Sequence, residues 1–383
     1  MEKYEITPSF NSNLTSTLFE MESIRNKFIS GDTPAWLFYD LKETLHLLES
    51  LSSARIEGNH TTLIAVINEA TAEKDDENKP EPEDMLCEII NINNAINYIE
   101  TYLKEGDVIT ATFVRELHAI TVDGLKRDGS QTPGRYRTGN VRIANSKCVV
   151  SSPAMIESDM LELIDYINAP HEKKEDIIRI ACAHHRFVAI HPFDNGNGRT
   201  ARLVTYAMLI KYGFLKNKKT LLNPSSFFCM DRQKYYNMLD LADEGKPSSV
   251  EAWCEYVASG IFDEINRMFK LLDKDFAVKN IIIPSVKASF ADKHLNEEEY
   301  RILLIAVEKD TIQASDVLSL FGATASDRIR CSRFLSNMVK KNLLYHPPKN
   351  PRKYVPRFFN KSLLTYVMSA MDKNDLILTK EEL

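Results

Sequence analysis

The sequence predicts a mainly α-helical protein, and three observations lead to this expectation. Apolar residues recur every three or four positions along most of the chain, as in the segment 37–48. The alternation that is typical of a β element is clear in one segment of the first 280 residues, 136–150. With 44% hydrophobic and 27% charged residues, the composition is that of an ordinary globular protein.

The 383 residues are enough for two or three domains. We expect an N-terminal helical region (1–100), a helical core (101–285) and a small C-terminal module (294–383). The net charge of −6 argues against a protein that binds polyanions over its whole surface. The chain shows no secretory leader, no membrane-spanning segment and no metal-like cysteine spacing, so we expect a cytoplasmic protein that does not enter a membrane.

The first helix of interest runs from Leu37 to Ile56. Gly58 and Asn59 follow it, which is typical of a helix C-terminus. Glu57 therefore lies at the negative end of the helix dipole, where an anion costs ~0.3–1 kcal/mol. We expect another group to hold this carboxylate, although an exposed glutamate near a helix end is the common alternative.

Residues 136–150 are the expected β element. Val141, Ile143 and two later valines flank a polar turn at 145–147, which is typical of a short hairpin. Such a hairpin either covers the core or offers a free edge to an extended peptide.

The segment 191–202, HPFDNGNGRTAR, lies between two helical runs, the first of which ends at Pro192. Glycines on both sides of Asn197 permit positive φ angles, so successive N–H groups can point at one anion near the positive end of the second helix. Arg199 and Arg202 lie three residues apart and can add forked donors. The segment is therefore predicted to bind a polyphosphate.

His191 stands at the mouth of this loop. An imidazole with a pKa of about 6.5 is mostly neutral in the cell and can take a proton from a hydroxyl, so His191 is our candidate general base. The alternative is a histidine that only caps its own helix. His184 lies on an apolar helix face and is expected in the core, and no zinc or kinase phosphate-loop motif occurs.

The string HPFDNGNGRTAR resembles the signature of the Fic family, and the similarity extends from about Ser53 to about Tyr236. Proteins of that family generally transfer the AMP moiety of ATP to a hydroxyl side chain of a protein. The resemblance implies that ATP and Mg²⁺ bind here, that His191 is the base and that Phe193 anchors the loop. It further implies these nucleotide contacts: Gly196, Asn197 and Gly198 at the α- and β-phosphates, Arg199 beside the phosphates, Arg202 at the γ-phosphate, and Tyr235 and Tyr236 at the adenine.

One position departs from the family pattern, which has Asp or Glu just before the first glycine as a Mg²⁺ ligand. Here that residue is Asn195. An amide oxygen ligates a hard cation without contributing charge, so we expect weaker metal binding unless Asp194 or the triphosphate compensates.

The resemblance also implies a role for the hairpin. Residues 134–143, GRYRTGNVRI, look like the lead-in to the β-flap with which Fic proteins pair an extended target segment. Val141, Arg142 and Ile143 would then dock a protein target and present its Ser, Thr or Tyr hydroxyl to the α-phosphate.

Ser53-x-x-x-Glu57-Gly58 resembles the inhibitory motif of Fic proteins, in which the glutamate pairs with the second arginine of the signature, here Arg202. That guanidinium cannot pair fully with Glu57 and with a γ-phosphate at once. The resemblance implies an autoinhibited transferase whose inhibitory helix precedes the core. In some members the same glutamate positions water for the removal of AMP, so a de-AMPylating enzyme is an alternative.

The C-terminal module has a different composition from the rest. Helical patterns at 297–309, 313–320 and 326–342 precede an extended, proline-containing end, and this order resembles a winged helix. Residues 323–361 hold ten basic residues against one acid, and Arg328, Arg330 and Arg333 are expected on the exposed face of the third helix. Two interpretations stay open: a DNA-binding regulator with a nucleotide-sensing core, or a module for protein contacts that include homo-oligomers.

Overall fold

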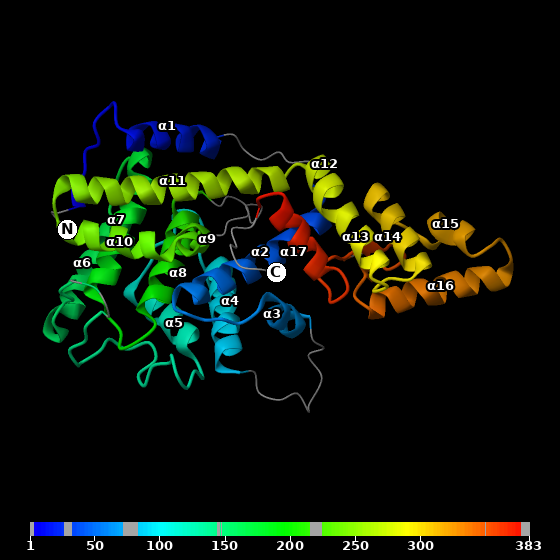
Figure 1. The fold of residues 1–383 in the computed structure, drawn as a ribbon, viewed down its shortest axis with the longest axis horizontal. Coiled ribbons are helices and arrows are strands. Elements are labelled where there is room, and N and C mark those ends of the chain that lie inside the picture. The colour runs from blue at the N-terminus through cyan, green and yellow to red at the C-terminus, as the bar shows by residue number, and fades with distance from the viewer. Residues whose placement is uncertain are drawn as a thin grey trace. The chain divides into compact units, whose positions relative to one another are not determined.

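The computed structural model describes residues 4–26, 33–71, 83–143, 146, 148–214, 224–348 and 350–376 (Figure 1). The described chain is mainly helical, as the sequence predicts. It divides into two compact units, the first formed by residues 1–28, 46–61 and 80–266 and the second by residues 29–45, 62–79 and 267–383. Two long helices, α2 (Ala35–Ile56) and α11 (Pro247–Leu271), contribute residues to both units.

The first unit is built around helix α8 (Asn197–Lys211). α8 packs against α7 (Asp176–Ile190), α5 (Ala111–Val122) and α4 (Asp84–Tyr102), and α7 in turn packs against α6 (Ile156–Asn168). All residues of α8 except Gly198 and Lys211 are buried. A helix that is covered on every side shows little amphipathic pattern, and any charged side chain inside it needs a partner.

Shorter elements complete the first unit. They are α1 (Asn13–Asn26), the 3-10 turns η2 (Pro153–Met155) and η3 (Lys173–Glu175), α9 (Ser225–Met230) and α10 (Arg232–Asp243). Trp253 of α11 is fully buried and donates its indole N–H to the carbonyl of Ala181 at 2.7 Å. Phe228 and Tyr235 pack around this indole and extend the core from α7 to α9 and α10.

The hairpin expected at 136–150 is replaced by irregular chain in the described residues of that segment, which form no strand. Val141 and Ile143 are half-buried and Arg142 is exposed. Asn145 and Lys147, which belong to the predicted turn, lie outside the described residues. At the start of this segment the backbone bonds to another part of the unit, because the N–H of Arg137 donates to the carbonyl of Pro192 at 2.9 Å.

The second unit contains α3 (Leu63–Ala70), α12 (Lys274–Phe276), the π-helical turn η5 (Ala277–Ile282), α13 (Ile283–Ala291) and α17 (Leu364–Lys373). Its first segment, the start of α2, is tied to the C-terminal part of the chain. Asp40 accepts a hydrogen bond from the N–H of Phe358 at 2.5 Å, and the ring of Trp36 packs on that of Phe358. Burial raises the pKa of Asp40 to about 7.

The same unit carries the elements expected at the C-terminal end. α14 (Glu297–Lys309), α15 (Ala314–Val317), the 3-10 turn η6 (Leu318–Leu320) and α16 (Ala325–Lys340) are followed by strands β1 (Leu344–Tyr345) and β2 (Val355–Pro356). β1 and β2 pair antiparallel, with Leu344 opposite Pro356, and Ile312 forms a bridge to Tyr354. The short strands thus tie the turn after α14 to the chain that follows α16. None of the described helices combines the length and apolar composition that a membrane span needs.

Candidate active site

The loop between α7 and α8 takes its shape from its own residues. His191 ends α7 with a left-handed backbone (φ 52°), and Gly196 precedes α8 with φ 72°, a conformation that favours glycine. Between them, the Asn197 side chain accepts a hydrogen bond from the N–H of Phe193 and donates one to its carbonyl, both at 2.9 Å. The ring of Phe193 is fully buried. The side chain of Asn197 therefore shapes the loop, and its backbone N–H remains for an anion.

The first turn of α8 has the geometry of an anion site. The N–H groups of Asn197, Gly198 and Arg199 precede the first intrahelical bond, which runs from the N–H of Thr200 to the carbonyl of Gly196 at 3.0 Å. The helix dipole adds positive potential at this point. A side chain at Gly198 would collide with Oε1 of Glu57. The carboxylate of Glu57 thus lies directly against the turn where a phosphate is expected.

Arg202 binds the end of α2 through three hydrogen bonds. Its Nη2 lies 2.8 Å from Oε1 of Glu57 and 2.9 Å from the carbonyl oxygen of Ser53, and its Nε donates to the Ser53 hydroxyl at 2.9 Å. The Arg202 side chain is 2% exposed, whereas that of Glu57 is 34% exposed. The structure therefore brings together the three residues of the predicted inhibitory contact, with the arginine buried and the glutamate at the surface.

The charges in this contact stabilise each other. Burial by itself would raise the pKa of Glu57, but Arg202 and Arg199 hold that pKa below its ordinary value. Conversely, burial would lower the pKa of Arg202, and the Glu57 carboxylate raises it above the ordinary value. Glu57 is therefore ionised at neutral pH and occupies the site as an anion.

His191 has the tautomer that the predicted role as a base requires. Its Nδ1 lies 3.3 Å from the carbonyl oxygen of Val188, which can only accept, so Nδ1 carries the proton and Nε2 keeps its lone pair. Burial lowers the pKa of His191, which keeps the imidazole neutral at pH 7. A neutral imidazole with a free lone pair is the form that accepts a proton from a hydroxyl.

Arg199 is held from two sides. Its Nη1 lies 2.8 Å from Oε1 of Glu88, and its Nη2 donates to the carbonyl of Asp128 at 2.8 Å. The side chain is 2% exposed, and its Nε has no hydrogen-bond partner among the described residues. A buried donor without a partner is costly, so Nε is available to a bound phosphate. Glu88 is a residue that the sequence does not single out.

Two further residues of the site were not predicted. Arg137 is 5% exposed and donates through Nε to the carbonyl of His191 at 2.7 Å and through Nη2 to that of Ser151 at 2.6 Å. It thereby joins both ends of the 137–151 segment to the loop between α7 and α8. A basic residue inside the GRYR string is the one sequence signal that could have suggested this anchor.

His118 of α5 is the second of these residues. Its ring stacks on Phe193 with centroids 3.7 Å apart, its Nδ1 accepts from the N–H of Gly134 at 3.0 Å, and its Nε2 donates to the carbonyl of Asn195 at 3.1 Å. Burial lowers its pKa to about 4, so the ring stays neutral. His118 therefore connects the segment that begins at Gly134 with the anion loop.

The two tyrosines expected at the adenine are placed differently from each other. Tyr235 is 2% exposed and its hydroxyl lies 2.8 Å from Nε2 of His184, within the aromatic core. The Tyr235 ring therefore has no exposed face in this structure, and its contact with the adenine stays a prediction. Tyr236 is half-buried, and its hydroxyl donates to the carbonyl of Ile56 at 3.2 Å. His184 is a buried core residue, as expected.

The oxygen atoms of Asn195 and Asp194 are the ones that this loop could offer to Mg²⁺. The amide oxygen of Asn195 accepts from the N–H of Gly196 at 2.7 Å, and Asp194 is exposed and accepts from the hydroxyl of Ser130 at 2.6 Å. Within the described ranges, no group of three or more His, Cys, Asp or Glu side chains could hold a metal ion. This donor set is weak for a free cation and fits one that arrives on a triphosphate, to which Asn195 can add one oxygen.

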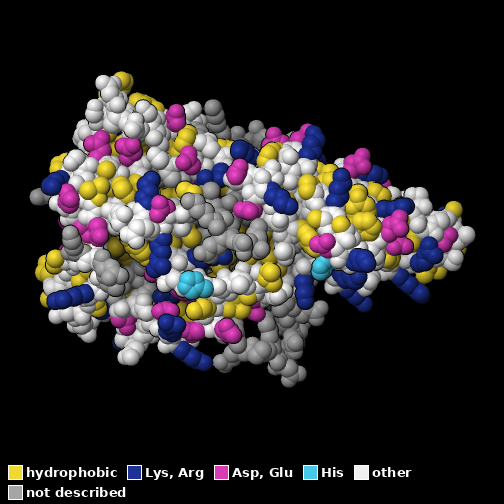
Figure 2. Space-filling view, viewed as in Figure 1, with side chains coloured by type: hydrophobic (Ala, Val, Ile, Leu, Met, Phe, Trp, Pro, Cys, Tyr) yellow, Lys and Arg dark blue, Asp and Glu magenta, His cyan; other side chains and the backbone are white. Residues whose placement is uncertain are grey.

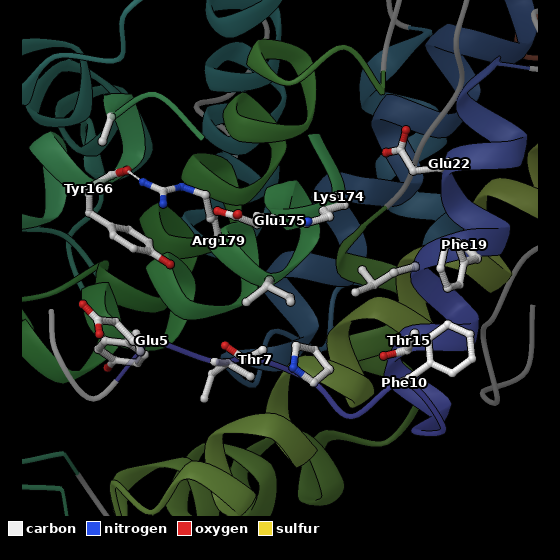
Figure 3. A pocket seen from close by; sticks show the side chains of 16 residues that line it. Glu5, Thr7, Phe10, Thr15, Phe19, Glu22, Tyr166, Lys174, Glu175 and Arg179 are labelled. Carbon is white, nitrogen blue, oxygen red and sulfur yellow. Dashed lines mark hydrogen bonds between the residues drawn. The ribbon is translucent and has the colours of Figure 1, made fainter. Parts of the chain in front are cut away.

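A separate cavity of about 930 Å³ lies in the first unit (Figure 3). N-terminal residues such as Phe10 and Phe19 line one part of it, and Tyr166 and Arg179 line another. The guanidinium of Arg179 lies over the Tyr166 ring at 4.0 Å from its centroid and donates to the backbone carbonyl of Tyr166. The lining contains no residue of the 191–202 segment, so this cavity is distinct from the candidate active site.

Comparisons with known proteins agree with this geometry. Residues 108–209 match the family model of the Fic/DOC family. The chain is 30% identical over 160 residues to a protein adenylyltransferase Fic of Nematostella vectensis, covering 41% of this chain and 34% of that protein. It is 29% identical over 177 residues to the protein adenylyltransferase fic-1 of Caenorhabditis elegans, covering 45% and 31%. The matches span about a third of the length of these curated relatives.

Solved structures extend the likeness of the fold. A Fic family protein from Desulfovibrio desulfuricans superposes with a TM-score of 0.57 at 18% identity, covering 93% of this chain and 97% of that one. Residues 134–508 of Fic-1 from C. elegans give a TM-score of 0.53 at 23% identity, covering 67% and 72%. The sequence match, the fold and the signature loop agree on one point: residues 108–209 of this chain are similar to the Fic/DOC family.

Proposed function

We propose that the protein is an adenylyltransferase that moves AMP from ATP to a Ser, Thr or Tyr hydroxyl of a target protein. The observation that carries this proposal is His191 at the start of the loop that leads into α8: its Nδ1 lies 3.3 Å from the Val188 carbonyl oxygen, which leaves the Nε2 lone pair as proton acceptor, and burial lowers its pKa. The curated relatives are named protein adenylyltransferases, which supports the same reaction. The catalytic core in this proposal is the segment 101–285.

In the proposed reaction, the target hydroxyl oxygen attacks the α-phosphorus of ATP and Nε2 of His191 takes the hydroxyl proton. The bond from that phosphorus to the oxygen bridging to the β-phosphate breaks, and pyrophosphate leaves. The N–H groups of Gly198 and its neighbours, together with Arg199, stabilise the charge on the phosphates. Mg²⁺, when bound with Asn195 among its ligands, neutralises charge that develops on the leaving pyrophosphate.

The target would be positioned by the 137–151 segment, with Val141, Arg142 and Ile143 beside it. Val141, Arg142 and Ile143 belong to no helix or strand, and strand addition at such a segment positions a side chain without a deep pocket. Arg137 keeps this segment against the catalytic loop. A target hydroxyl presented there lies near His191.

Glu57 acts as the brake in this proposal. Its carboxylate pairs with Arg202 and lies against Gly198, so it competes with the γ-phosphate for the same donors. Ser53 strengthens the closed arrangement through the hydrogen bonds that it accepts from Arg202.

The test is the intact mass of the protein and of lysate targets after incubation with ATP and Mg²⁺. We expect Glu57→Gly to gain additions of AMP on itself or on targets, and Glu57→Gly combined with His191→Ala to gain none. Equal labelling by wild type and Glu57→Gly would show that Glu57 does not inhibit the transfer. Labelling that survives His191→Ala would show that His191 is not the base. Release of AMP from a labelled target by the wild-type protein would instead favour the de-AMPylating alternative.

A second candidate function, DNA binding by the winged-helix-like module, is favoured by the surface of α16. Arg328 and Arg333 are exposed, and Arg330 lies over the Phe321 ring and donates to its carbonyl at 2.9 Å. Figure 2 shows Lys and Arg side chains along the side of the second unit that α16 forms. We expect duplex DNA binding that falls steeply with salt and is lost when Arg328 and Arg333 are changed to glutamine. Absence of binding at low salt would leave protein contacts, including homo-oligomers, as the role of this module.

A further inference from the structure

Glu88 of α4 is a buried carboxylate with a different partner on each oxygen. It is 4% exposed. Its Oε1 lies 2.8 Å from Nη1 of Arg199, and its Oε2 accepts from the side-chain amide of Asn59 at 2.7 Å. A carboxylate in such surroundings is stable only while both partners remain in place. Glu88 therefore joins a residue of the signature to the turn that follows α2.

Asn59 belongs to the turn that carries Glu57. Its Nδ2 also donates to the carbonyl of Met85 at 2.7 Å, and its Oδ1 accepts from the N–H of Thr61 at 2.9 Å. Between Glu57 and Asn59 stands Gly58, whose φ of 97° lets the chain reverse there. The side-chain bonds of Asn59 thus hold the far end of this turn against the start of α4.

The end of α2 is consequently attached to α8 at two residues, Arg199 and Arg202, which lie three positions apart on α8. Glu57 binds Arg202 directly, and Asn59 reaches Arg199 through Glu88. Because the Glu57 side chain is partly exposed, its own ion pair is the weaker restraint, and the buried Asn59–Glu88 bond is the stronger one.

We propose that Glu88 is a positioning residue that sets the strength of the brake: its hydrogen bond to Asn59 holds the turn so that Glu57 stays on Arg202, while its ion pair with Arg199 aligns the same turn with the nucleotide site. This inference rests on the proposed function, because it deepens the competition between Glu57 and ATP. It predicts that ATP affinity depends on Asn59. The hydrogen bonds of the Asn59 side chain go to Met85, Glu88 and Thr61, and so reach the signature loop only through Glu88.

The test is ATP affinity, measured by titration calorimetry with Mg²⁺ in a His191→Ala background, where nucleotide is not consumed. We expect Asn59→Ala to tighten ATP binding about tenfold, or ~1.4 kcal/mol. In the presence of Glu57→Gly, Asn59→Ala should change the affinity no further. An unchanged affinity, or the same change with and without Glu57, would overturn the proposal.

Asn91 provides the matched control. It lies on α4 one turn after Glu88, is 6% exposed and donates through Nδ2 to the carbonyl of Asp123 at 2.7 Å. Asn91→Ala removes a comparable buried bond, so it should lower thermal stability to a similar extent and leave ATP affinity as it was. If Asn91→Ala tightens ATP binding as much as Asn59→Ala does, a general loosening of the fold explains both and the proposal fails.

A charge swap tests the bond itself. In Glu88→Gln the new amide must face two donors, Asn59 and Arg199, and can accept from only one of them without placing its NH₂ group against the other. Combining Glu88→Gln with Asn59→Asp restores one donor and one acceptor at that contact. We expect the first variant to tighten ATP binding and the pair to return it toward the parent value, and a pair no different from the single variant would contradict the inference.

These measurements separate the inference from the function that it deepens. If the coupled ATP affinities are found but no variant transfers AMP, the proposed function fails and the role of Glu88 stands. If Glu57→Gly transfers AMP while Asn59→Ala behaves like Asn91→Ala, the function stands and the inference fails.

Discussion

Glu49 is expected to make the stability of the first unit depend on pH. It lies on α2 two turns before Glu57 and is 3% exposed, and its carboxylate accepts bonds from the N–H of Ser225 at 2.8 Å and from the Ser225 hydroxyl. Burial raises its pKa from 4.5 to about 7. The folded state therefore keeps a proton that the unfolded chain has already lost between these two values.

The sign and size of the effect follow from that difference. A raised folded-state pKa contributes stability that is fully present below pH 4.5 and is lost as the pH rises through about 7. Between pH 5 and pH 8 the wild-type protein should lose ~2.5 kcal/mol of unfolding free energy from this group. Glu49→Gln keeps the shape and an acceptor for the Ser225 N–H while removing the titration, so it should be relatively more stable at pH 8 by about that amount.

The assay is urea unfolding of wild type and Glu49→Gln at pH 5 and pH 8, followed by far-ultraviolet circular dichroism and by tryptophan fluorescence. Glu116→Gln, a change at an exposed glutamate of α5, serves as the control for loss of one charge. A stability difference between Glu49→Gln and wild type that is the same at both pH values would refute the reasoning, because burial would then not hold a proton on Glu49.

Three further predictions concern the catalytic loop and the core. Burial lowers the pKa of His191 from 6.5, so in the pH–rate profile of AMP transfer by the Glu57→Gly protein the rate should fall with acid only below pH 6.5. A fall that begins above pH 6.5 would exclude His191 as the base. His118→Ala removes the link between Gly134 and the anion loop, so kcat/KM in the Glu57→Gly protein should fall about tenfold or more, and an unchanged value would show that the link is dispensable. Trp253→Ala should lower the unfolding free energy by ~3–5 kcal/mol in urea melts. A loss under ~1 kcal/mol would mean that neighbouring side chains fill the cavity left by the indole.

Local sequence signals predicted the parts of the site that are local in the chain. Gly196 takes the positive φ that the loop needs before α8, and Gly58 marks the end of α2 because its backbone also needs positive φ. The helix 297–309 was predicted with its observed bounds, because Asn296 caps it and the charge and apolar patterns agree.

Partners that come from distant segments were beyond such signals. Glu88, His118 and Arg137 contact the loop from three separate parts of the chain, and each looks like an ordinary helical or loop residue in its own context. The burial of Tyr235 was not predicted for the same reason, because it depends on packing against His184, which no spacing within 235–236 can reveal. The described residues of 136–150 form no strand, and alternation alone cannot show whether a neighbouring strand or the rest of the fold takes the backbone bonds.

The burial of α8 determines which partner of the Glu57–Arg202 contact can move. With every residue but two packed on all sides, the helix that bears both arginines behaves as a rigid receptor, and displacing it would open the centre of the unit. Glu57, whose carboxylate binds Arg202, is partly exposed and precedes the turn at Gly58. If Glu57 inhibits the protein as proposed, release requires the short turn at 57–59 to move away from a fixed Arg202, and the cost is set by the few hydrogen bonds that hold this turn.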